Sequence, residues 1–193
     1  RNRGGNLVSK AAEEADVLDW LMAGDPAIRW QTMRDLLDES EVRWQRERAR
    51  VAEDGWGPRL LAKRGEDGRW GRGLYTPKWT STNYTLLVLR DMGLPQDHPV
   101  GREGACLLLG RLTGEAFQER LEKLDLCIVG MYLSLSSYFR VADPRVDMLA
   151  EEALRSQLPD GGWNCAARRH PVRHSSLHST MNVLDGLADF AEY

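Results

Sequence analysis

The stretch Asp160-Gly161-Gly162-Trp163 decides the fold, because it repeats the earlier stretch Asp67-Gly68-Arg69-Trp70 after 93 positions. Half of that interval is about 46 residues, a typical length for a repeat of two helices. The halfway point, 114–117, reads Gly-Glu-Ala-Phe, so the glycine is kept and a phenylalanine replaces the tryptophan. A helix-like run follows each of the three turns, and an earlier run of the same kind begins near Trp30. The sequence therefore predicts about four repeats of ~49 residues.

Local signals indicate helices throughout the chain. Asp25-Pro26 and Asp143-Pro144 each place a capping side chain before a proline suited to the first helical position. No segment alternates polar and apolar residues as a strand would. The helices are expected near residues 12–22, 26–38, 41–53, 80–92, 98–112, 124–139, 144–158 and 177–192. We therefore predict an all-α fold and a single domain over residues 1–193.

Composition excludes several classes of protein. With 42% hydrophobic and 28% charged residues, the 193-residue chain has the composition of a soluble globular protein. A net charge of −3 counts against nucleic-acid binding through a basic surface. Apolar runs such as Leu107–Leu109 are far shorter than the roughly 20 residues of a transmembrane helix. Three cysteines make no disulfide framework and the opening residues carry no secretory pattern, so a reducing cytoplasm is the expected location.

The segments Gln157–Trp163 and Arg64–Trp70 resemble the end of the QW repeat of terpenoid cyclases. Over roughly residues 25–193 the chain resembles the squalene–hopene cyclase and protein prenyltransferase superfamily. The resemblance implies an α/α toroid, a barrel of helical hairpins whose inner helices ring a central cavity. With about four repeats, this toroid is expected to be partial. The first turns of the inner helices would face the cavity mouth, where their unpaired N–H groups suit a diphosphate.

The function that this resemblance implies is to act on, or bind, an isoprenoid-like small molecule in the cavity. As an enzyme, the protein would be transferase-like or cyclase-like. The acid motif Asp-x-Asp-Asp of the cyclases does not occur, which counts against cyclisation initiated by protonation. The alternative is a non-catalytic α/α repeat scaffold that binds a small apolar ligand or a protein. No nucleotide cofactor is expected, because the sequence has neither a P-loop nor a Rossmann fingerprint.

A closer resemblance is to the β subunit of protein farnesyltransferase, where an Asp-x-Cys and a later histidine bind zinc. Here Asp125-Leu126-Cys127 opens one expected inner helix and His178 opens a later one. The resemblance implies that Asp125, Cys127 and His178 hold a catalytic zinc ion with an open fourth position. His174, four residues before His178, and Cys165 are the alternate ligands. The competing interpretation makes Cys127 a small buried residue and Asp125 a helix cap.

The basic loop before the last expected helix contains Arg168, Arg169 and Arg173. Arginine forks match phosphate oxygens, so this loop is either a clamp for a diphosphate or a solvated connection. Cys106 stands beside three leucines and is expected in the core.

The aromatic residues also have two interpretations. Trp30, Trp79 and Tyr84 lie near expected starts of inner helices, where their rings could line an isoprenoid pocket. Trp70 and Trp163 end the repeated turns and are expected to be structural.

The last expected helix has no outer helix after it to cover its apolar side chains. These are Val183, Leu184, Leu187, Ala188 and Tyr193. Stacked repeats need a polar cap at their ends. We therefore expect a homo-oligomer or missing C-terminal repeats.

Overall fold

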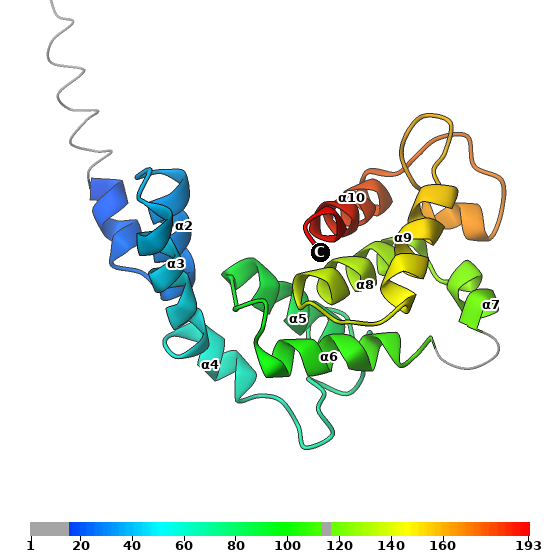
Figure 1. Ribbon diagram of the computed structural model, residues 1–193. Coiled ribbons are helices and arrows are strands. Elements are labelled where there is room, and N and C mark those ends of the chain that lie inside the picture. The colour runs from blue at the N-terminus through cyan, green and yellow to red at the C-terminus, as the bar shows by residue number, and fades with distance from the viewer. Residues whose placement is uncertain (1–15, 113–116) are drawn as a thin grey trace, which may run out of the picture. The chain divides into compact units, whose positions relative to one another are not determined.

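The structure, a computed structural model, describes residues 16–112 and 117–193, and every regular element in these ranges is a helix (Figure 1). Residues 16–22 are helical. The further α-helices are α2 (Pro26–Asp35), α3 (Glu41–Ala49), α4 (Trp56–Leu61), α5 (Thr82–Met92), α6 (Pro99–Leu109), α7 (Phe117–Lys123), α8 (Leu126–Tyr138), α9 (Arg145–Arg155) and α10 (Leu177–Ala191). Two short 3₁₀ helices are η1 (Arg50–Ala52) and η2 (Cys165–Arg168). The prediction of an all-α fold is confirmed, and the toroid stays a prediction.

The chain divides into two compact units. The first ends at Ala62 and also includes Asp91–Pro95, and the second comprises Lys63–Arg90 and Gln96–Tyr193. The sequence predicted a single domain over residues 1–193, and that stays a prediction because the division into two units does not test it. None of the helices in the described ranges has the length and apolar character that crossing a bilayer requires.

The first unit is organised around Trp30, whose side chain is only 5% exposed. Its indole N–H donates a hydrogen bond to the carbonyl oxygen of Met92 at 2.7 Å. The guanidinium groups of Arg34 and Arg48 lie over the ring, 4.7 and 5.3 Å from its centroid. These contacts satisfy both the polar edge and the faces of the indole. Trp30 is therefore a core residue of this unit, with little surface left for a ligand.

The second unit is built around α8, which is buried along its whole length. Its sequence is apolar or small on every side, as expected for a central helix. α10 lies against it: Gly130 and Gly186 bring the two backbones together, and Ser134 donates a hydrogen bond to Asp189 at 2.7 Å one turn later. Because contacts follow the same order in both helices, α8 and α10 run parallel (Figure 1).

α5 follows the same direction as α8. The side-chain amide of Asn83 contacts the sulfur of Met131 at 3.2 Å, and Arg90 donates to Ser134 Oγ at 2.6 Å further along. α5, α8 and α10 therefore begin at the same end of the second unit. The outer helix α6 packs through Gly104 against Leu86 of α5.

The two repeated turns, 65–70 and 158–163, have the same backbone hydrogen bonds. In each turn the N–H of the fourth residue donates to the carbonyl of the first, at 2.9 Å in both. The N–H of the first residue donates to the carbonyl of the fifth, at 2.8 and 2.9 Å. The fourth residues, Gly68 and Gly161, have φ values of +77° and +86°, which only glycine adopts at little cost. The sequence repeat is thus also a structural repeat.

Each turn is fixed to the start of the next inner helix through its tryptophan. The N–H of Trp70 donates to Thr82 Oγ1 at 3.2 Å, and that of Trp163 to Thr180 Oγ1 at 3.0 Å. Both tryptophans are 2% exposed, so their predicted structural role is confirmed. The expected halfway turn falls mainly on residues 114–116, which lie outside the described residues.

Candidate functional site

The starts of α5, α8 and α10 bring together several of the residues that the sequence singled out. We call this group the helix-start site. It consists of Tyr75, Trp79, Tyr84, Asp125, Cys127, Cys165, Arg169 and Ser179.

A pair of cysteines lies at the centre of the site. The backbone N–H of Cys127, near the start of α8, donates to the Sγ of Cys165 at 3.2 Å. The hydroxyl of Ser179, in the first turn of α10, lies 3.1 Å from the same sulfur. The structure thus joins Cys127 to Cys165, the alternate ligand, and both are free thiols.

These contacts make the two thiols unequal. The hydrogen bond from Cys127 lowers the pKa of Cys165 to about 5, against an opposing effect of burial and with further help from Ser179. The hydrogen bond to Cys165, together with burial, raises the pKa of Cys127. A sulfur at a helix start also gains from the positive end of the helix dipole. These contacts therefore favour negative charge on Cys165 over Cys127.

Asp125 and Arg169 form the polar edge of the site. Arg169 Nη1 lies 2.6 Å from Asp125 Oδ1, with the two side chains 60% and 35% exposed. Asp125 is the N-cap residue of α8 but makes no capping hydrogen bond with its side chain. An ion pair this exposed adds little stability. The guanidinium of Arg169 can therefore leave Asp125 and bind an anion at a small cost in free energy.

A row of aromatic rings forms the other edge of the site. The ring centroids of Trp79 and Tyr84 are 5.2 Å apart, and those of Tyr84 and Tyr75 are 5.5 Å apart. Burial raises the pKa of Tyr75, and so does the hydrogen bond with Tyr84.

The loop that carries Trp79 is held on the start of α5. Ser81 Oγ donates to the carbonyl of Tyr75 at 2.9 Å, and the N–H of Asn83 donates to that of Leu74 at 2.8 Å. Trp79 itself has a φ of +72°, a strained value for a bulky residue, and its side chain is 78% exposed. The fold therefore holds a large apolar ring out in solvent at a conformational cost.

The two histidines do not join this group. α10 begins at Leu177, so His174 precedes the helix and cannot share a helical face with His178, and both side chains are exposed. Within the described ranges, no three His, Cys, Asp or Glu side chains are grouped so that they could hold a metal ion. Asp125, Cys127 and His178 thus do not fit a three-ligand zinc site in this geometry, and zinc stays a prediction from the resemblance.

The other arginines of the basic loop differ in their surroundings. Arg168 pairs with Glu152 of α9, whose side chain is 1% exposed. Arg168 therefore has a partner inside the fold, whereas Arg173 is exposed. Their predicted role in a diphosphate clamp stays a prediction.

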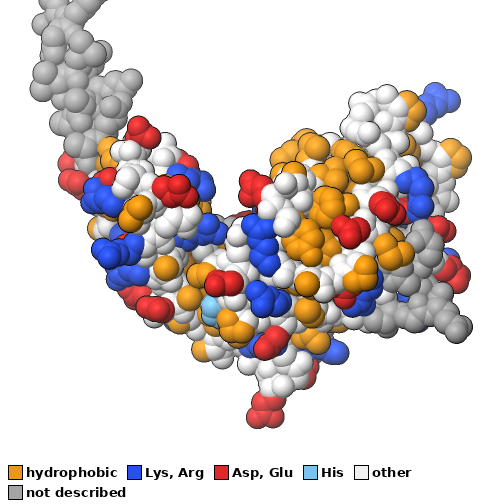
Figure 2. Space-filling model, viewed as in Figure 1, with side chains coloured by type: hydrophobic (Ala, Val, Ile, Leu, Met, Phe, Trp, Pro, Cys, Tyr) orange, Lys and Arg blue, Asp and Glu red, His pale blue; other side chains and the backbone are white. Residues whose placement is uncertain are grey.

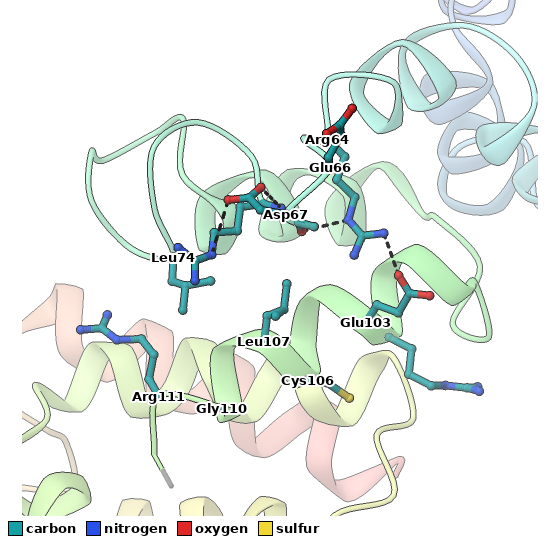
Figure 3. A pocket seen from close by; sticks show the side chains of 12 residues that line it. Arg64, Glu66, Asp67, Leu74, Glu103, Cys106, Leu107, Gly110 and Arg111 are labelled. Atoms are coloured by element: carbon teal, nitrogen blue, oxygen red, sulfur yellow. Dashed lines mark hydrogen bonds and ion pairs between the residues drawn. The ribbon is translucent and has the colours of Figure 1, made fainter.

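The second unit also has a groove of about 830 Å³ between the turn 65–70 and α6 (Figure 3). Arg64 spans it, donating to the carbonyl of Gly68 at 2.9 Å and pairing with Glu103 at 2.7 Å. Cys106 lines this groove and is exposed, so its expected place in the core is wrong. The reason is helical spacing, because Cys106 shares a face with Glu103 and Gly110 rather than with the buried leucines.

Two residues of the site were missed by the sequence analysis. Ser179 carries a detectable signal, because Ser179-Thr180 repeats the pair Ser81-Thr82 at the start of an inner helix. Tyr75 carries none, because its position depends on the path of an irregular loop. Comparison of the chain with family models, curated proteins and solved structures gave no match.

Proposed function

We propose that this protein binds a small apolar, isoprenoid-like molecule at the helix-start site. The observation that carries the proposal is Trp79, which is 78% exposed and has its ring centroid 5.2 Å from that of Tyr84. A large apolar side chain kept in solvent by a strained backbone stabilises the fold little, so a binding role accounts for it better. The neighbouring, tilted rings of Trp79, Tyr84 and Tyr75 offer apolar surface to an isoprenoid chain.

The polar edge of the site supports a diphosphate at one end of that molecule. Arg169 is exposed, and the partner described for its guanidinium is the half-buried carboxylate of Asp125. A diphosphate would bind the guanidinium in a bidentate manner, which a single carboxylate oxygen does not match. The proposal therefore assigns the chain end to the aromatic row and the anionic end to Arg169.

Calorimetric titration with farnesyl diphosphate, farnesol and inorganic pyrophosphate tests the proposal. Trp79→Ala should weaken binding of farnesyl diphosphate and farnesol at least about tenfold, since it removes most of the exposed aromatic surface. Arg169→Gln should weaken binding of farnesyl diphosphate and leave farnesol unchanged. The matched control is Trp20→Ala, which removes a tryptophan that is 73% exposed in the first unit. Absence of heat with all three compounds, or equal losses in both tryptophan variants, would contradict the proposal.

Catalysis is a separate question from binding. The non-catalytic scaffold remains the second candidate, and the observation that favours it is the lack of a three-ligand metal group among the described side chains. Incubation with farnesyl diphosphate and a small thiol distinguishes the two. A prenylated thiol would indicate a transferase, and unchanged substrates with retained binding would indicate a scaffold. The cytoplasm is the location that we propose for either.

Zinc is tested by the metal content of the protein purified without chelator. About one zinc ion per chain, lost in Cys127→Ser, would support the ligand set Asp125, Cys127 and His178. Metal content that is the same in both proteins would remove Cys127 from any such set.

We also propose that copies of the chain associate through the exposed face of α10. Hydrophobic side chains gather over this helix (Figure 2), and Leu177, Met181 and Leu184 are 79%, 50% and 47% exposed. Their spacing puts them on one side of the helix. Sedimentation at increasing concentration should show a mass above that of one chain, and Met181→Glu should lower it. A single-chain mass at all concentrations would contradict a homo-oligomer.

A further inference from the structure

We propose that Cys127 and Cys165 form a reversible disulfide, so that the helix-start site is also a redox-active dithiol. The inference does not depend on the ligand proposed above. It rests on the contact of one sulfur with the other residue's backbone, on their unequal exposure, and on the donors around Cys165.

The geometry favours a bond between these two residues. The Sγ of Cys165 lies 3.2 Å from the backbone nitrogen of Cys127. Disulfides usually join Cα atoms about 4.4–6.8 Å apart, so a sulfur already in contact with its partner's backbone needs little movement to reach the partner's sulfur. The third cysteine, Cys106, lies on α6 in the groove and is not part of this pair.

The surroundings assign the two sulfurs different parts in the reaction. Cys165 is partly exposed, and its sulfur contacts the Cys127 N–H and the Ser179 hydroxyl. Cys127 is 6% exposed. An oxidant from solvent therefore meets Cys165 first, and Cys127 is the residue that completes the bond.

The oxidant is a small-molecule disulfide of the glutathione class. The Cys165 sulfur attacks one sulfur of that disulfide, which breaks the small-molecule S–S bond and releases one thiol. The Cys127 sulfur then attacks Cys165 Sγ, which breaks the mixed disulfide and releases the second thiol. Two protein thiols are oxidised, one small disulfide is reduced to two thiols, and the two protons pass from the cysteines to those thiols.

The bond would join the start of α8 to the segment that leads into α10. It would fix the cysteine edge of the site beside Asp125, the N-cap residue of α8. Because small thiols reverse the exchange, such a pair responds to the redox state of a reducing compartment.

Counting free thiols in the full chain tests the inference. The protein is equilibrated at low concentration in buffers of increasing oxidised-to-reduced glutathione ratio, denatured, alkylated and analysed by mass. The number of alkylated cysteines should fall from three to one, with Cys106 still alkylated and one peptide pair joined through Cys127 and Cys165. In the Cys106→Ser variant, the number of alkylated cysteines should fall from two to none.

Two single variants separate the roles. Cys127→Ser should retain glutathione on Cys165, because the second attack is lost, whereas Cys165→Ser should leave Cys127 without glutathione. Three alkylated cysteines at every ratio in the unaltered protein would overturn the inference. A bridge that includes Cys106, or one between two chains, would also overturn it.

Discussion

At the residue scale, the site depends on a few side chains whose surroundings differ from those that their type suggests. Trp30 and Trp79 were alike in sequence, since both lie near expected helix starts. Trp30 is 5% exposed and hydrogen-bonded, whereas Trp79 is 78% exposed on a strained backbone. No local pattern separates the two, because burial is decided by which distant residues pack against each ring. The sequence therefore predicted the aromatic candidates but not which of them was accessible.

Glu152 gives a prediction at this scale. Its buried carboxylate is held by Arg168 and by the hydroxyl of Ser156. Glu152→Gln keeps the shape but leaves the mostly buried Arg168 without its charged partner, so the free energy of unfolding should fall by about 2–4 kcal/mol at pH 7. Chemical denaturation of both proteins measures this difference in the free energy of unfolding. The control is Glu119→Gln, which removes an exposed pair with Lys123 and should change stability little.

The same pair predicts a dependence on pH. Burial opposes ionisation of Glu152, but the hydrogen bonds from Arg168 and Ser156 outweigh it and lower its pKa below the ordinary value of 4.5. A lowered pKa gives stability that is complete above the ordinary value and is lost as the pH falls through the folded-state value. The difference in stability between the unaltered protein and Glu152→Gln should therefore shrink as the pH falls below 4.5, and denaturation curves at a series of pH values measure it. A difference that stays constant down to pH 3 would contradict this assignment.

At the scale of the elements, the sequence predicted the long helices well. Helices expected near 26–38, 80–92, 124–139 and 177–192 correspond to α2, α5, α8 and α10 with ends shifted by up to three residues. Their apolar patterns and capping signals are long enough to be read locally. α4 and α7 were missed because six and seven residues carry too few turns for a periodic pattern.

The contact between α8 and α10 was not predictable, because it depends on two glycines far apart in the chain. A Cβ atom added at Gly130 would lie 2.3 Å from the carbonyl oxygen of Asn182, a backbone atom that cannot turn aside. Gly130→Ala should lower the free energy of unfolding by about 2 kcal/mol or more. Gly110→Ala is the control, because its nearest atom would be 3.2 Å away at the end of α6. Equal thermal shifts in the two variants would argue against a close crossing.

The repeated turns predict matched effects. Thr82→Val and Thr180→Val each remove the oxygen that accepts the N–H of a buried tryptophan. Each should cost about 1–3 kcal/mol, since each removes a hydrogen bond made by the backbone of a buried residue. If only one of the two variants is destabilised, the turns are not equivalent in energy despite their common hydrogen bonds. Thermal unfolding of both variants measures this.

At the scale of the whole molecule, each unit is held by its own core. The second unit contains the helix-start site complete, because α5, α8 and α10 all begin there. The resemblance implied that the inner helices would begin at one cavity mouth; the contacts show that α5, α8 and α10 begin at the same end, and the toroid stays a prediction. The spacing could not predict the pairing of Cys127 with Cys165, because the segment between Trp163 and Leu177 follows no repeat pattern.

The central claim is that a prenyl chain binds at the helix-start site, and photo-crosslinking tests it most directly. The full chain is irradiated with a benzophenone-bearing prenyl diphosphate, with and without excess farnesyl diphosphate, and the labelled peptides are identified by mass. The account predicts label within residues 74–84 or 164–179 that the competitor removes. Competed label confined to the groove along α6, or to the first unit, would contradict it.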